Sequence, residues 1–188
     1  MSPDQKVEKV KRLLPEIEMI SDPSLAEKVI KVWIEAWKHS EFENLEDIPY
    51  AVSIRSGIGY NAIGHISTTA RCAVAIAKTL KEMHGLKVDL DYLVAGALLH
   101  DVSKVVEFSK QGGRTPLGQK IPHGCYGIAA ALAQDLPIEV VHIIASHTPN
   151  LKKAPQSLEA LIVHHIDMLE ADCNTLLSGD ELYSARRV

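Results

Sequence analysis

Cysteine is scarce in this chain, with three Cys among 188 residues. Cys72, Cys125 and Cys173 are odd in number and lie far apart in the sequence. They therefore match neither the paired spacing of a zinc knuckle nor the framework of a disulfide-rich secreted domain. A reducing compartment fits this cysteine usage best, so we expect a cytoplasmic protein.

Long apolar runs are also absent. No uninterrupted run approaches the roughly 20 apolar residues that a membrane-spanning helix needs. The first residues, Met-Ser-Pro-Asp-Gln-Lys, lack the apolar segment of a signal peptide. We therefore expect neither export nor insertion into a membrane.

The chain has no cluster of basic residues. Its formal net charge is −4, and its Lys and Arg residues are spread along the sequence. A nucleic-acid polymer would find no broad cationic face to neutralise its phosphates. We therefore expect no nucleic-acid polymer as a partner, whereas a small anionic substrate is compatible with this charge. The sequence leaves open whether the chain forms a homo-oligomer.

Strand-like alternation is nearly absent, and apolar residues recur instead at helical spacing. Hydrophobic residues make up 46% of the chain, which is enough for one sizeable core, and no change of composition marks a second domain. We predict an all-α, single-domain helical bundle. Helices are expected at residues 21–37, 65–84, 89–106, 123–136, 138–147 and from 158 onward, with a loop at 41–64 and a polar surface loop at 109–122.

Six residues that can bind metals fall where such helices could bring them together. His100 and Asp101 end an apolar helix in the run Gly-Ala-Leu-Leu-His-Asp-Val-Ser-Lys, where an isolated buried charge would be costly unless a cation compensates it. Imidazole and carboxylate groups suit Fe, Mn, Zn, Co or Ni, and a set of six can hold two ions. The set is His65, His100, Asp101, His123, His147 and Asp167, with Asp101 as the natural bridge. His164 and His165 lie within one helical turn of Asp167 and are alternatives to it.

The order of these six residues closely resembles that of the HD-domain superfamily of metal-dependent phosphohydrolases, over roughly residues 60–172. The stretch Leu-Leu-His-Asp-Val-Ser-Lys is similar to the family's His-Asp-Ile-Gly-Lys, with Ser103 where glycine is common. The resemblance implies His65, His100, Asp101 and Asp167 as the basic metal-binding set. It implies His123 and His147 as the additional histidines of members that bind a second metal.

The resemblance also implies a domain plan and an activity. Residues 1–188 would form one HD-type domain with a metal-binding core at about 60–172 and N-terminal helices, 1–40, packed on it. The chain would be a phosphomonoesterase or phosphodiesterase that acts on a small phosphorylated metabolite such as a nucleotide or dinucleotide. The Gly-Tyr-Pro signature of the cyclic dinucleotide phosphodiesterase branch is absent, since Thr-Pro-Asn follows His147. That branch is therefore not expected.

The expected cofactors are two divalent transition-metal ions, of Fe, Mn, Ni, Co or Zn. A metal lowers the pKa of its bound water from about 15.7 toward 7, which makes a hydroxide nucleophile available. Asp101 could orient that water, and Lys104 could stabilise charge on the phosphate or the leaving oxygen. Arg114 and Lys120, on the loop that follows, could close over the anion. Lys104 also fits a plain solvated cation near a helix C-terminus, and Arg114 and Lys120 fit ordinary loop charges.

Two other functions are compatible with the same residues. Some relatives with this ligand order are di-iron oxygenases that cleave a C–C or C–P bond, and six intact ligands leave that chemistry open. A non-catalytic metal- or ligand-binding module is the other alternative. Iron content with oxygen consumption would indicate the first, and failure to retain a transition metal would indicate the second.

Overall fold

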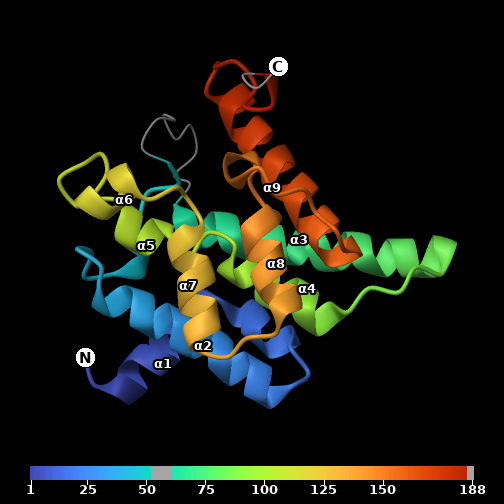
Figure 1. Cartoon of the computed structure of the whole chain (residues 1–188), viewed down its shortest axis with the longest axis horizontal. Helices are drawn as coiled ribbons and strands as arrows, with labels where there is room; N and C mark the ends of the chain where they lie inside the picture. The colour runs from blue at the N-terminus through green and yellow to red at the C-terminus, as the bar shows by residue number, and fades with distance from the viewer. Residues whose placement is uncertain (52–60, 186–188) are drawn as a thin grey trace.

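Regular structure is helical in residues 1–51 and 61–185, the part of the chain described in a computed structural model (Figure 1). β-Pairing in this part is limited to isolated bridges between Pro49 and Asn61 and between Phe108 and Arg114. The all-α class predicted from the sequence is therefore confirmed. None of the helices in the described ranges is long and apolar enough to cross a membrane.

The helices alternate with short connections. In chain order they are α1 (Pro3–Leu13), the 3₁₀ helix η1 (Pro15–Met19), α2 (Pro23–Lys38), η2 (Leu45–Asp47), α3 (Ala62–His84), α4 (Leu90–Leu99), α5 (Lys104–Glu107), α6 (Pro116–Lys120), α7 (Cys125–Ala133), α8 (Ile138–Ser146), η3 (Pro149–Leu151) and α9 (Leu158–Leu177). Local signals set several ends. The side chains of Asp22, Asn61 and Ser157 cap α2, α3 and α9, and Gly85, at φ 66°, ends α3.

Helix α4 is the centre of the bundle, where it packs against α2, α3, α8 and α9 (Figure 1). Residues 93–99 are all buried, so α4 is apolar on every side, as a central helix must be. Trp33 of α2 is fully buried, and its indole N–H donates to the carbonyl of Leu98 at 3.2 Å. The N-terminal helices are thereby fixed to the helix that carries His100.

Helices α4 and α8 cross closely at Gly96. A Cβ atom at this glycine would lie 2.5 Å from Ile143, so a side chain there would push the two helices apart. His100 follows Gly96 by one helical turn, and His147 follows Ile143 by one turn. The crossing therefore places these two histidines side by side, with ring centroids 5.2 Å apart.

The helix predicted at 89–106 is interrupted. Helix α4 ends at Leu99, and residues 100–103 form turns before α5 begins at Lys104. In this stretch the backbone N–H groups of Val102 and Lys104 bond to carbonyls three residues earlier, those of Leu99 and Asp101. Asp101 therefore lies in a turn between α4 and α5, and not within one continuous helix as the spacing predicted.

The polar segment 109–122 is also more ordered than predicted. It contains α6, and the hydroxyl of buried Thr115 donates to the carbonyl of Val106 at 2.7 Å. Gly118 permits this packing, because a Cβ there would lie 2.3 Å from the carbonyl oxygen of Glu107. The loop expected at 41–64 contains η2 and the first turn of α3, and its Gly57 and Gly59 lie outside the described residues.

Candidate metal centre

Five elements bring the six predicted residues together. His65 lies on α3, His100 and Asp101 follow the end of α4, His123 precedes α7, His147 ends α8, and Asp167 lies on α9. Their ligand atoms form two groups, within each of which all the atoms lie within 4.8 Å of one another. We name them the inner group (His65, His100, Asp101, Asp167) and the outer group (Asp101, His123, His147).

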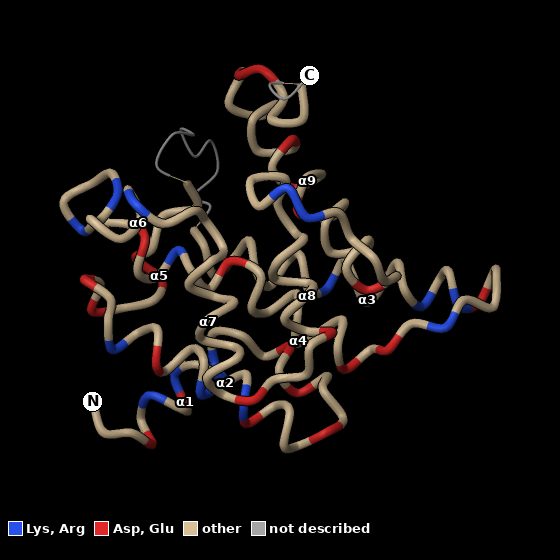
Figure 2. The backbone as a smooth tube through the Cα atoms, viewed as in Figure 1, with Lys and Arg blue, Asp and Glu red and all other residues tan. Residues whose placement is uncertain are grey.

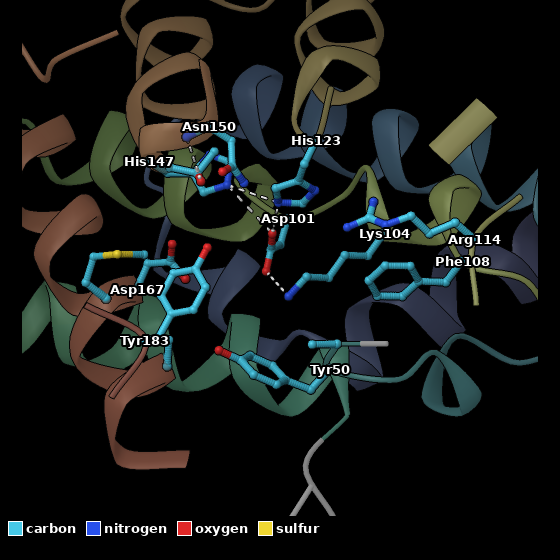
Figure 3. A pocket seen from close by; sticks show the side chains of 14 residues that line it. Tyr50, Asp101, Lys104, Phe108, Arg114, His123, His147, Asn150, Asp167 and Tyr183 are labelled. Carbon is cyan, nitrogen blue, oxygen red and sulfur yellow. Dashed lines mark hydrogen bonds and ion pairs between the residues drawn. The ribbon is translucent and has the colours of Figure 1, made fainter. Parts of the chain in front are cut away.

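Asp101 belongs to both groups because its two carboxylate oxygens face different histidines. Its Oδ2 atom is 3.1 Å from His65 Nε2 and 3.5 Å from His100 Nε2. Its Oδ1 atom is 2.8 Å from His123 Nε2 and 3.7 Å from His147 Nε2 (Figure 3). One buried carboxylate thus lies between two sets of imidazole nitrogens.

The inner group has a second carboxylate, that of Asp167 on α9. His164 and His165 were the alternatives to it in the sequence. Asp167 Oδ1 lies 3.1 Å from His65 Nε2 and 3.8 Å from His100 Nε2. The alternatives lie elsewhere: His164 Nδ1 is 2.8 Å from the carbonyl oxygen of His147, and His165 is exposed. Of these three residues, Asp167 is the one whose side chain joins the cluster.

The histidines present the same ring nitrogen to the centre. His100 Nδ1 lies 2.6 Å from the carbonyl oxygen of Ala97, and His147 Nδ1 lies 2.7 Å from that of Ile144. A carbonyl can only accept, so both Nδ1 atoms donate and both neutral rings have a lone pair on Nε2. His65 and His123 make the corresponding Nδ1 contacts to carboxylates, those of Glu170 and Glu107, each at 2.8 Å.

This donor set fits a divalent transition metal. The Nε2 atoms of His65 and His100 are 3.2 Å apart, and those of His123 and His147 are 3.4 Å apart, with Asp101 between the pairs. Convergent imidazole nitrogens and carboxylate oxygens, each histidine held at its other nitrogen, are the arrangement that metal ligands adopt in proteins. The residues present therefore suit the ions that the sequence predicts.

Two of the histidines hold a proton more tightly than usual when no metal is bound. Burial and the positive charge of Lys104 act to lower the pKa of His65, but hydrogen bonds to three carboxylates, Asp101, Asp167 and Glu170, raise it to about 10. Burial also opposes the charge of His123, whose contacts with Asp101 and Glu107 raise its pKa to about 9. Each half of the centre therefore holds one imidazolium at neutral pH.

The other two histidines are neutral. Burial lowers the pKa of His100 below its ordinary value. Burial lowers the pKa of His147 to about 3, and the positive charge of His123 acts in the same direction. Burial alone would raise the pKa of Asp101, but Lys104 and the surrounding histidines hold it well below the usual range. The carboxylate shared by the two groups is therefore ionised, which suits the binding of a cation.

Lys104 lies against the carboxylate of Asp101. Its side chain is nearly buried, and Nζ is 2.5 Å from Asp101 Oδ2 and 4.5 Å from the ring centroid of Tyr50. The ammonium group is therefore part of the site rather than a solvated charge at a helix end. It balances some of the negative charge that the buried carboxylates bring.

A cavity of about 130 Å³ opens in front of the cluster. Figure 3 shows Lys104 between Asp101 on one side and the rings of Tyr50 and Phe108 on the other. Arg114, at the rim, has its guanidinium 5.6 Å from the ring centroid of Phe108. Tyr183 lines the opposite part of the cavity. A small anionic molecule can thus approach Asp101 between positively charged and aromatic side chains.

Lys120 does not line this cavity. Its side chain is exposed and borders a neighbouring hollow, which shares Arg114, His123 and Asn150 with the cavity. The structure therefore brings Lys104 and Arg114, but not Lys120, to the space in front of the cluster.

Sequence reasoning missed Glu107, Glu170, Tyr50 and Tyr183. Both glutamates are buried and stand close to apolar runs, where an acidic residue needs a partner. The cost of burying an acidic residue without a partner was the signal that could have identified both glutamates. The two tyrosines carried no signal, because they reach the cavity from segments outside the stretch that contains the predicted ligands.

Comparison with known proteins agrees with this arrangement. Residues 62–172 match the HD domain. The chain is 30% identical over 178 residues to a dihydroneopterin 2',3'-cyclic phosphate phosphodiesterase of Methanocaldococcus jannaschii, with 88% of this chain and 70% of the relative covered. No solved structure gives a significant match.

Two kinds of ribonuclease match a shorter part. A ribonuclease Y of Mycoplasma capricolum is 32% identical over 120 residues, which cover 64% of this chain and 20% of that enzyme. The 3'-5' exoribonuclease YhaM of Bacillus subtilis is 28% identical over 135 residues, covering 64% of this chain and 40% of the relative. The alignments therefore cover less than half of each ribonuclease.

The chain belongs to the HD-domain family. Its reaction class is that of a metal-dependent phosphohydrolase. The predicted family and class of enzyme are therefore confirmed.

Proposed function

We propose that the chain hydrolyses a phosphodiester in a small metabolite, with a 2',3'-cyclic phosphate as the first candidate substrate and two divalent metal ions as cofactors. The observation that carries the proposal is the position of Asp101, whose two oxygens face the inner and the outer group separately. A carboxylate in that position can join two ions.

The six residues of the two groups would hold these ions. When bound, two such ions supply a hydroxide near neutral pH and neutralise charge on the phosphoryl oxygens. Asp101 is ionised and fixed by Lys104, so it can orient a water molecule at the cavity end of the cluster. Lys104 and Arg114 offer positive charge where negative charge develops on the phosphoryl group and the leaving oxygen.

Two features favour a small substrate over RNA. The cavity is small and has aromatic side chains in its lining, which suit a planar ring attached to the phosphate. Figure 2 shows Lys and Arg scattered along the described backbone and interspersed with Asp and Glu, a distribution that favours a small anion over a polymer. The relative that covers most of this chain is named for a cyclic phosphate of a pterin, a compound with such a ring.

The test is a hydrolysis screen on protein purified anaerobically, stripped of metal and reloaded with Mn²⁺ or Fe²⁺. The panel contains pterin and nucleoside 2',3'-cyclic phosphates, 3',5'-cyclic nucleotides, phosphomonoesters, a dinucleotide and a short RNA. We expect fastest turnover of a 2',3'-cyclic phosphate without oxygen, and two ions per chain by elemental analysis. Faster cleavage of RNA would reject the small-substrate proposal, and product formation only with oxygen consumption would indicate the di-iron oxygenase alternative.

A further inference from the structure

We propose that Glu107 and Glu170 are positioning residues, one for each half of the centre. Each would fix the ring of one histidine, His123 or His65, so that its Nε2 atom faces Asp101. This inference rests on the proposed two-metal function and explains how two of the four rings are oriented.

The need for these carboxylates follows from where each histidine lies. The last carbonyls of a helix have no partner within the helix. His100 and His147 follow the ends of α4 and α8, so they can bond to the free carbonyls of Ala97 and Ile144 three residues earlier. His65 lies in the first turn of α3, and Ile121 and Pro122 separate His123 from the end of α6, so neither histidine directly follows a helix end. Their acceptors must come from another element.

Glu170 supplies the acceptor for His65 from α9. Its carboxylate is buried, and Oε2 accepts from His65 Nδ1 at 2.8 Å and from the Thr69 hydroxyl at 3.0 Å. Thr69 is fully buried one helical turn after His65, so the hydroxyl and the ring hold the same oxygen. The other oxygen, Oε1, has no hydrogen-bond partner among the described residues. The carboxylate is thus directed at α3.

Glu107 supplies the acceptor for His123 from the end of α5. It is 1% exposed, and its Oε2 lies 2.8 Å from His123 Nδ1. Its Oε1 accepts from the backbone N–H of Gly124 at 3.3 Å, so the carboxylate holds both the ring and the adjacent backbone. Arg114 Nη1 is farther from Oε2, at 3.4 Å. The contact with His123 is therefore the closer of the two made by Oε2.

For each glutamate, a pair of variants can distinguish the effect of the negative charge from the effect of the position of the acceptor oxygen. Glu107→Gln and Glu170→Gln retain an acceptor oxygen at nearly the same reach, whereas Glu107→Asp and Glu170→Asp retain the charge but shorten the side chain. If position matters, the Asp variants should lose affinity and the Gln variants should retain most of it. Loss of such an outer contact typically weakens metal binding about 10- to 100-fold.

The experiment is a Mn²⁺ and Co²⁺ titration of metal-free protein, with the Co²⁺ absorption spectrum as a second readout. We expect Glu107→Asp to weaken the binding of one ion, the ion that is lost in His123→Ala. Glu170→Asp should weaken the binding of the other ion, which is lost in His65→Ala. The matched control is Glu16→Asp, because Glu16 is similarly buried and accepts from Ser67 of α3 but has no hydrogen bond or ion pair to a histidine within residues 1–51 and 61–185. It should leave both affinities unchanged, and circular dichroism checks the folding of every variant.

The outcomes distinguish failure of the inference from failure of the proposed function. If the wild-type chain binds two ions and both Asp variants bind them with unchanged affinity and Co²⁺ spectrum, the positioning roles are wrong. The positioning roles are also wrong if each Asp variant weakens the binding of both ions equally, as a general loss of packing would. If the wild-type chain binds only one ion, the two-metal function is wrong.

Discussion

The inner and outer groups share Asp101 and use the same histidine nitrogen, but they differ in completeness and access. The inner group has four donor residues, including a second carboxylate, and all are buried. The outer group has three, and the side chain of His123 is 15% exposed and lines the cavity. Four protein donors can complete the coordination of an ion, whereas three leave a position for solvent or substrate.

The supporting elements differ in the same way. The inner group is carried by α3 and α9, the two longest helices, and by the end of α4. The outer group depends on the connection before α7, on the end of α8, and on Lys104 and Arg114 nearby. Under the proposed two-metal function, we expect the inner half to serve mainly to hold an ion and the outer half to meet the substrate.

The largest effect should come from the residue common to both halves. Asp101→Ala should remove metal from both groups and reduce hydrolysis by at least about a thousandfold, the upper range for loss of one electrostatic group. Helical content should remain nearly intact, because the core is apolar and lies beneath the site. Metal analysis and circular dichroism test this together. Full retention of metal and turnover would remove Asp101 from the site.

Removal of the outer histidines should separate the two halves. The double variant His123→Ala with His147→Ala should retain one ion and lose at least about a hundredfold in turnover. A double variant of exposed histidines, His39→Ala with His84→Ala, is the control and should behave as the wild type. Elemental analysis and Mn²⁺ titration count the ions. If the double variant still binds two, the outer group is not a metal site.

A variant of Lys104 tests the interaction with substrate without removing a candidate metal ligand. Lys104→Ala should reduce turnover about a hundredfold if its ammonium meets developing phosphate charge. Metal content should not change. Lys110→Ala is the matched control, since Lys110 is an exposed lysine paired with Glu43 away from the cavity. An unchanged rate in Lys104→Ala would leave this residue with only its ion pair to Asp101.

Metal affinity in both halves should depend on pH in the same direction. His65, with a pKa raised to about 10, and His123, with a pKa raised to about 9, are protonated at neutral pH, so each ion must displace a proton. Affinity should therefore rise by up to about tenfold per pH unit for each proton released, and level off near pH 10 for the inner group and pH 9 for the outer. Titration calorimetry in buffers of different ionisation enthalpy measures the protons. Affinity independent of pH between 6 and 8 contradicts the assignment.

The smallest effect should come from Tyr183, which lines the cavity but lies outside residues 62–172, the part that matches the HD domain. Tyr183 follows α9 in a segment held by Ser184, whose hydroxyl donates to Asp172 at 2.6 Å. Tyr183→Ala should raise KM about fivefold, corresponding to about 1 kcal/mol for one aromatic contact, and leave kcat and both metals unchanged. Tyr183→Phe should retain most of the affinity for substrate. Equal kinetic constants for Tyr183→Ala and the wild type would show that the ring does not touch the substrate.

The fold class and the order of the candidate ligands could both be predicted from the amino-acid sequence. Helical spacing and local caps such as Asp22, Asn61 and Ser157 depend on residues close in the chain, so they can be read without the tertiary structure. The same holds for placing His100 and His147 at helix ends. The ordered set from His65 to Asp167 was sufficient to identify the family.

The division of the cluster into two groups, and the contacts that hold its rings, depend on how the helices pack. Asp101 lies in the turn at residues 100–103, which interrupts the helix that periodicity predicted, and its two oxygens face different groups. Glu170 and His65 are 105 residues apart, and Lys120 lies outside the cavity although it is close in sequence to Arg114. A contact of this kind depends on how helices pack, and its energy is set by burial and distance rather than by any local pattern. For that reason the sequence could name the ligands, whereas the carboxylates that orient them became evident only when α3, α5 and α9 were placed in space.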